Sequence, residues 1–170
     1  MIIMLCISLV LAVSFTGIAT MRLKSLPESI SSLVYVFRWK WLWTLWMWSV
    51  ALLTCIPCID ILLGVGMEFL GFGMMACLCF CGSMPLFDKE HVTWHWITGT
   101  AGCILSQICV YFIEAQWLGL WMACLFLIGA GYVQPQGWLG KAIKDKWVFL
   151  AESACYISLI GAMLTQLWFL

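Results

Sequence analysis

Long apolar segments separated by short polar breaks dominate this chain. A helix needs about 20 apolar residues to cross a bilayer, and six segments meet that length. The predicted spans cover about residues 2–21, 41–59, 64–86, 92–113, 117–134 and 147–170. The boundary between the second and third spans is the least defined, because Asp60, Gly64 and Glu68 lie there without a long polar loop. The pattern predicts an all-α fold, with residues 1–170 forming a single transmembrane helical bundle.

Composition excludes the alternatives to a membrane protein. Of the 170 residues, 65% are hydrophobic and 9% are charged, whereas soluble domains carry about 45–50% apolar and about 25% charged residues. A net charge of zero gives no field that would attract nucleic acid, so we expect no nucleic-acid partner. Most of the 10 cysteines lie within apolar runs, where a thiol behaves as a small hydrophobic group rather than as half of a disulfide.

Positive charge predicts how the chain is oriented. With six spans, every Lys and Arg falls in the loops of one side, and cytoplasmic loops are the ones that carry Lys and Arg. The first of these loops holds Arg22, Lys24, Arg38 and Lys40, the second holds Lys89, and the third holds Lys141, Lys144 and Lys146. We therefore expect a multi-pass cell-membrane protein with both termini outside the cytoplasm.

The first basic loop has a pattern of its own. Ser25 and Glu28 have the spacing of a helix capping box, and apolar residues then recur at helical spacing through Phe37. This predicts a short amphipathic helix over about 26–37 in the cytoplasmic interface, and a simple extension of the second span is the alternative. The side chains expected near lipid headgroups are Arg22, Lys24, Arg38, Lys40, Trp39 and Trp41.

The same region carries a family resemblance. The stretch from Pro27 to Tyr35, the Trp-rich span after it and the histidines that begin a later span resemble a group of small polytopic membrane proteins of gut Bacteroidales and their phages. No established activity comes with that group. The resemblance implies the inner membrane of a bacterium as the setting.

Titratable residues near the start of the fourth span form one candidate site. Asp88, His91 and His95 are three and four residues apart and share one face of a helix. They can hold zinc or relay a proton, or Asp88 can simply cap the helix at the headgroup layer. Glu152 in the sixth span lies on the same side of the membrane. It can complete a polar pocket with the histidines and the Ser29–Tyr35 loop, or pair locally with Lys146 or Trp147. His91, His95 and Glu152 are the candidate catalytic residues, and Asp88, His91 and His95 are the candidate zinc ligands.

A second candidate site is the motif formed by Cys55 and Cys58 near the outer end of the second span. A C-x-x-C pair can lower a thiol pKa and support disulfide exchange. In this position the motif resembles the general plan of the DsbB and vitamin K epoxide reductase families. This chain has no loop large enough to hold their second cysteine pair.

Three functions follow from these observations. The first is a non-enzymatic membrane protein that binds lipid or a membrane partner through its cytoplasmic face. The second is a metal-dependent lipid-modifying hydrolase, similar in plan to the alkaline ceramidase-like enzymes but without their third histidine. The third is a thiol oxidoreductase. A chain of this size can also assemble into a homo-oligomer.

Overall fold

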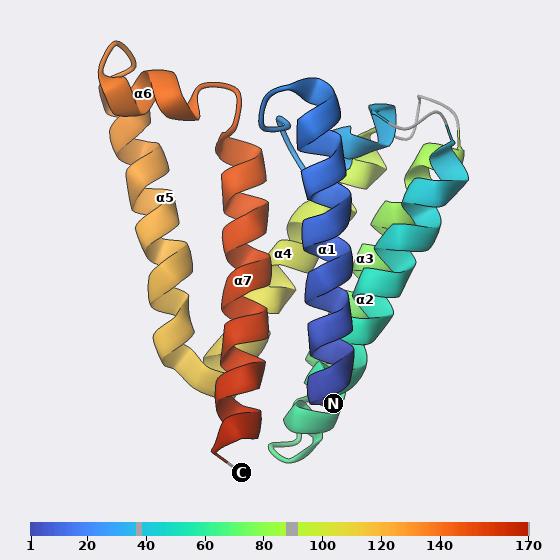
Figure 1. Cartoon of the computed structure of the whole chain (residues 1–170). Coiled ribbons are helices and arrows are strands. Elements are labelled where there is room, and N and C mark those ends of the chain that lie inside the picture. Colours follow the sequence, from blue (N-terminus) through green and yellow to red (C-terminus); the bar gives the residue numbers. More distant parts are fainter. Residues whose placement is uncertain (37–38, 88–91, 170) are drawn as a thin grey trace.

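The computed structural model describes residues 1–36, 39–87 and 92–169, and this part of the chain is built from helices. The helices that run from one end of the bundle to the other are α1 (Ile2–Leu23), α2 (Lys40–Leu63), α3 (Glu68–Ser83), α4 (Val92–Glu114), α5 (Leu118–Val133) and α7 (Trp147–Trp168). A short helix, α6 (Trp138–Ile143), lies across one end of the bundle (Figure 1).

Length and hydropathy confirm a multi-pass membrane bundle. Among the described residues, 5 helical runs are long and apolar enough to cross a membrane, and one of them is the 41-residue run Thr93–Val133. That run contains both α4 and α5. Glu114 leaves the helical conformation (φ −159°), and the 3-10 helix η4 (Ala115–Trp117) then turns the chain. Because of this turn the run makes two helices rather than one, as the sequence predicted.

The bundle has two distinct ends. The N- and C-termini lie at one of them, together with the turns that join α2 to α3 and α4 to α5 (Figure 1). We call this the terminal end. The opposite end holds the end of α1, the starts of α2 and α7, and α6. We call it the basic end, because the described cationic residues Arg22, Lys24, Lys40, Lys141, Lys144 and Lys146 all belong to it.

The boundary between the second and third spans differs from the prediction. Helix α2 runs on to Leu63, and α3 begins only at Glu68. Asp60, which the predicted span 41–59 leaves out, is an exposed residue in the last turn of α2. The turn falls at Gly66, which has a φ of 70°, a left-handed conformation that glycine adopts without a steric penalty.

The amphipathic helix predicted over 26–37 is much shorter. Within residues 26–36, the described part of this stretch, the helical residues are those of the 3-10 helix η1 (Ser31–Tyr35), and the residues before it are not helical. Phe37 lies outside the described residues. The reason lies in their backbone partners, because the Phe149 N–H of α7 donates to the Glu28 carbonyl (3.1 Å). A backbone group bound to another element is not free for a helix. The segment therefore folds against the bundle, with Leu33 fully buried.

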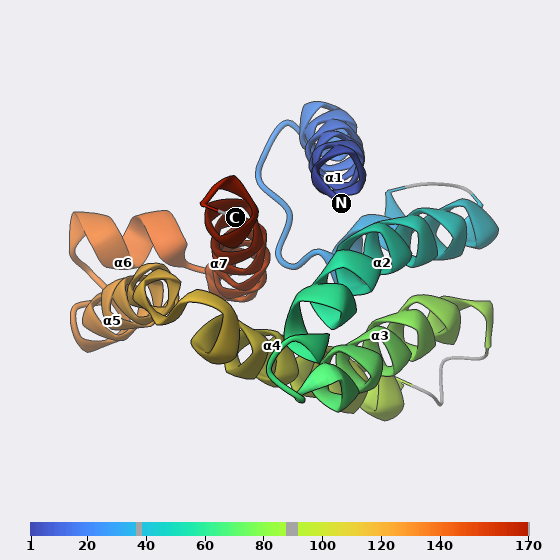
Figure 2. The same ribbon diagram turned by 90° about the horizontal axis from the view of Figure 1, so that it is seen from below.

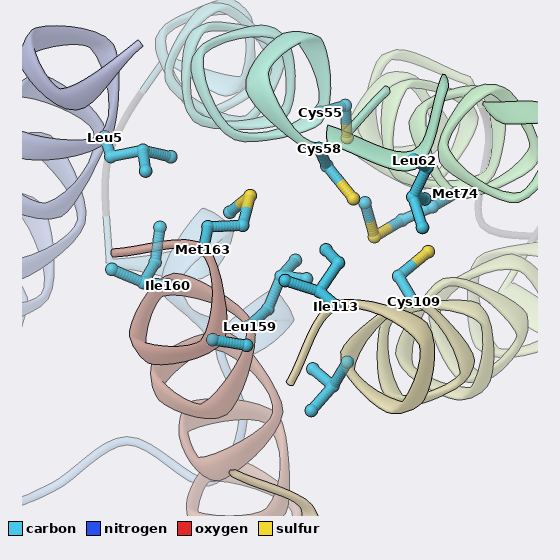
Figure 3. Packing of buried hydrophobic residues seen from close by; sticks show 12 residues of the cluster. Leu5, Cys55, Cys58, Leu62, Met74, Cys109, Ile113, Leu159, Ile160 and Met163 are labelled. Atoms are coloured by element: carbon cyan, nitrogen blue, oxygen red, sulfur yellow. The ribbon is translucent and has the colours of Figure 1, made fainter. Parts of the chain in front are cut away.

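Two clusters of buried side chains hold the helices together. One joins α2, α3, α4 and α7 around residues such as Leu62, Met74 and Met163 (Figure 3). The other joins α1, η1 and α2 around Trp43 and Leu33. Helices α2, α3 and α4 pack side by side, and α1 and α5 stand at the margins of the bundle (Figures 1 and 2).

Candidate functional site

A cavity of about 520 Å³ lies between the helices. It is lined by residues of α1, α2, α3, α4 and α7 and by Ile30 and Ser31 of the first basic loop. Most of these side chains are apolar, including Val13 of α1 and Val50 of α2. A volume of about 300–1,000 Å³ with a mainly apolar lining and a few polar groups is typical of ligand pockets.

The cavity extends along the helices. Its lining runs from Leu9 to Thr20 on α1 and from Trp43 to Thr54 on α2. At 1.5 Å per residue either stretch is about 17 Å long, slightly more than half of a hydrocarbon core that is about 30 Å thick. Thr20 and Trp43 lie toward the basic end, so the cavity lies in the part of the bundle nearer that end.

Glu152 provides the carboxylate of this cavity. It lies on α7, in the second turn from the basic end, and lines the cavity. Its Oε2 accepts a hydrogen bond from the Ile30 backbone N–H (2.6 Å), and that N–H is the one donor to this carboxylate in the described part of the chain. The non-helical loop before η1 and the first turns of α7 therefore position this side chain together.

Aromatic side chains line the same end of the cavity. Trp43 and Trp46 both line it, and their ring centroids are 5.0 Å apart. Phe15 of α1 stacks on Trp46 at 4.4 Å, and the Trp46 indole N–H donates to the Leu11 carbonyl at 3.0 Å. The indole N–H of Trp43 is buried and has no acceptor among the described residues. A buried donor without an acceptor costs about 1–3 kcal/mol.

Deeper in the bundle the polar lining groups are already paired. The Ser8 hydroxyl lies 2.8 Å from both the Thr54 hydroxyl and the Tyr156 hydroxyl, which links α1, α2 and α7. The Ser106 hydroxyl of α4, which lines the cavity, donates to the Cys103 carbonyl at 2.7 Å and accepts from the Gln107 side-chain amide at 3.1 Å. Such pairing is what a membrane interior requires of polar groups. The free hydrogen-bonding capacity of the cavity therefore lies at its basic end.

His95 does not line the cavity. Its Nδ1 lies 3.1 Å from the Cys81 carbonyl and 3.5 Å from the Cys81 thiol, both on α3. Cys81 itself lines the cavity together with Glu152. The structure thus brings Glu152 to the backbone of Ile30 in the first basic loop, whereas His95 contacts Cys81.

The predicted zinc ligands Asp88 and His91 lie outside the described residues. Within the described ranges, no three His, Cys, Asp or Glu side chains come together as a metal-binding group. The zinc hypothesis remains a prediction that depends on residues 88–91.

The C-x-x-C cysteines lie in the packed core, whereas the thiol-oxidoreductase hypothesis requires an accessible thiol. Cys55 and Cys58 are both fully buried within α2. Figure 3 shows them among apolar side chains, with Cys58 close to Met74 and Cys109. A thiol must reach its reaction partner to exchange disulfides, and packing of this kind explains cysteine here as a small core residue.

The predicted lipid-interface residues that the structure describes lie at the basic end. Trp39 and Trp41 are exposed, and their rings stack with centroids 6.1 Å apart. Arg22, Lys24 and Lys40 lie at the same end. Arg38 lies outside the described residues.

The cavity itself was missed by sequence reasoning. A signal for it exists in the first span, where Thr16, Gly17 and Thr20 are small residues close together on one helix face. Space for a Cβ at Gly17 is open, with no heavy atom within 4 Å. Small residues on a membrane helix usually mark a site of close helix packing, and here they line a cavity instead.

Comparison with known proteins adds no functional assignment. The chain matches no protein-family model, no curated protein and no solved structure.

Proposed function

We propose that this protein is a non-enzymatic membrane protein that holds one hydrocarbon chain of a lipid in its cavity. The single observation that carries the proposal is an apolar cavity of about 520 Å³ that extends along the helices. An acyl chain lies in a leaflet along the same direction and over about the same length. The cavity offers it apolar side chains in place of neighbouring lipid tails.

The basic end is the proposed cytoplasmic face. Lys and Arg concentrate in cytoplasmic loops, and all the described cations lie at this end. Both termini then lie outside the cytoplasm, and the lipid head lies at the cytoplasmic interface near Glu152. The resemblance to membrane proteins of gut Bacteroidales favours the inner membrane of a bacterium.

The contacts of the candidate catalytic side chains favour a binding function over hydrolysis. Glu152 accepts from a backbone N–H, and His95 contacts the Cys81 carbonyl. These contacts fix the side chains within the bundle. The hydrolase alternative depends on His91 and is favoured only if purified protein holds about one zinc per chain that is lost in His91→Ala.

Filling the cavity tests the proposal. Gly17→Phe places a large side chain in the open space at Gly17, and Gly129→Phe is the matched control, because no heavy atom lies within 4 Å of a Cβ at either position. Gly17 lines the cavity and Gly129 of α5 does not. Displacing two methylene groups of a bound chain removes about 1.6 kcal/mol, which is more than tenfold in Kd.

Native mass spectrometry of the purified protein with hexadecanol measures this effect. We expect one alcohol bound per wild-type chain, the same binding in Gly129→Phe, and at least about tenfold weaker binding in Gly17→Phe. Equal binding by the two variants places the chain elsewhere on the protein and overturns the proposal.

A further inference from the structure

We infer that the lipid held in this cavity is a single-chain amphiphile with an ammonium head, recognised by Glu152 together with Trp43 and Trp46. This inference rests on the proposed function and adds the chemistry of the head group. The carboxylate and both indoles line the cavity at its basic end. The three side chains come from α7 and α2, two helices that are far apart in sequence.

The first argument is the unused capacity of the carboxylate. An ionised carboxylate accepts about four hydrogen bonds, and the Ile30 N–H donates the one bond found among the described residues. Ionisable groups at membrane depth normally face a partner of opposite charge or a water-filled cavity. Among the described residues, the Ile30 N–H is the group found to bind this carboxylate, and a ligand with a cationic head would supply the opposite charge.

The second argument is the aromatic lining. A cation binds favourably over the face of an indole, and carboxylate-plus-aromatic sites are suited to ammonium groups. Trp43 and Trp46 line the cavity and pack against each other. An anionic head, by contrast, meets a carboxylate of the same sign and no described cation inside the cavity.

The carboxylate and the aromatic cluster belong to one packed unit. Ile30, whose N–H binds Glu152, packs against the buried cluster that contains Trp43 and Trp46. Tyr156, one helical turn after Glu152, packs against the same cluster. A head group bound to the carboxylate is therefore held at the level of the indoles, with its chain running down the apolar part of the cavity.

The Trp43 indole N–H indicates a further feature of the head group. The indole is fully buried and lines the cavity, yet its N–H lacks an acceptor among the described residues. An oxygen next to the ammonium group satisfies that donor. The best match is therefore a long-chain amine that carries a hydroxyl or carbonyl oxygen close to its nitrogen.

Three probes of one chain length separate the head group from the chain. Hexadecylamine, hexadecanol and hexadecanoate are each titrated at neutral pH against wild-type protein and Glu152→Gln, with native mass spectrometry as the readout. Gln keeps an oxygen that accepts the Ile30 N–H and removes the charge, so the loop contact is retained. Thermal unfolding of both proteins without ligand serves as the folding control.

We expect wild-type protein to bind the amine at least about tenfold more tightly than the alcohol, and the carboxylate most weakly. In Glu152→Gln the amine should lose about tenfold while the alcohol is unchanged. If wild-type protein binds the amine and the alcohol equally well, the inferred ammonium head is wrong, and the proposed site for the hydrocarbon chain is unaffected. If Gly17→Phe and Gly129→Phe bind hexadecanol equally well, the proposed site for the hydrocarbon chain is wrong. If Glu152→Gln fails to fold, the relative affinities of wild-type protein for the three probes still test the ammonium head.

Discussion

Adding a single methyl group at Gly161 tests how tightly α7 packs against Trp117. It lies on α7, and a Cβ built there meets three ring carbons of Trp117 at 2.6, 2.6 and 2.7 Å. An aromatic ring cannot bend aside as the end of a flexible chain does. Trp117 is also held by a hydrogen bond from its indole N–H to the Thr165 hydroxyl at 3.0 Å. Gly161→Ala therefore forces the ring to move and strains that bond.

The expected change in the free energy of unfolding combines two destabilising effects and one stabilising effect. Overpacking a well-packed site costs about 1–3 kcal/mol, and loss of the Trp117–Thr165 hydrogen bond adds about 0.5–1.5 kcal/mol. Alanine is the better helix former by about 1 kcal/mol. The expected net destabilisation is about 1–3 kcal/mol. At Gly129, where no atom lies within 4 Å of the new Cβ, only the favourable helix effect remains.

Thermal unfolding in detergent, followed with a fluorogenic thiol reagent, measures the difference. The reagent reports global unfolding, because core cysteines such as Cys58 and Cys109 are buried in the folded bundle. We expect Gly161→Ala to unfold at a lower temperature than wild type and Gly129→Ala to match or exceed wild type. In a Trp117→Leu background, Gly161→Ala should cost much less, because the ring that it displaces is gone. Equal stability of Gly161→Ala and Gly129→Ala refutes the packing argument.

Three further predictions concern the topology, a buried polar contact and the thiols. A reporter that is active only in the cytoplasm should work when fused after Lys144 and fail at the C-terminus, and the reverse result contradicts the proposed orientation. Gln107→Leu removes one of the two acceptors of the Ser158 hydroxyl, which keeps the Cys155 carbonyl. It should destabilise the protein by about 0.5–1.5 kcal/mol in the same unfolding assay, whereas no change shows that the contact contributes nothing. Cys55 and Cys58 should resist alkylation by iodoacetamide in the folded protein, because both are fully buried. Rapid alkylation without unfolding reopens the redox hypothesis.

Hydropathy determined the elements of this protein from sequence alone. Spans such as 92–113 and 147–170 match α4 (Val92–Glu114) and α7 (Trp147–Trp168) within two residues, Leu170 being outside the described residues. Runs of this length can satisfy their backbone polar groups in a membrane only as helices. The position of the described Lys and Arg residues at one end of the bundle could likewise be predicted from the sequence, because each loop must lie at one end or the other of the spans it joins.

The partner of each side chain was decided by tertiary structure. In a soluble helix, the apolar stripe identifies the buried face, but in a membrane the lipid-facing side is apolar too. Hydropathy therefore gave no sign that α1 lines a cavity at Gly17 or that Cys58 is buried against α4. The same limit explains the first basic loop. Its pattern was helical, but its Ile30 N–H binds Glu152 of α7, more than one hundred residues away, and no local pattern encodes a backbone contact with a distant helix.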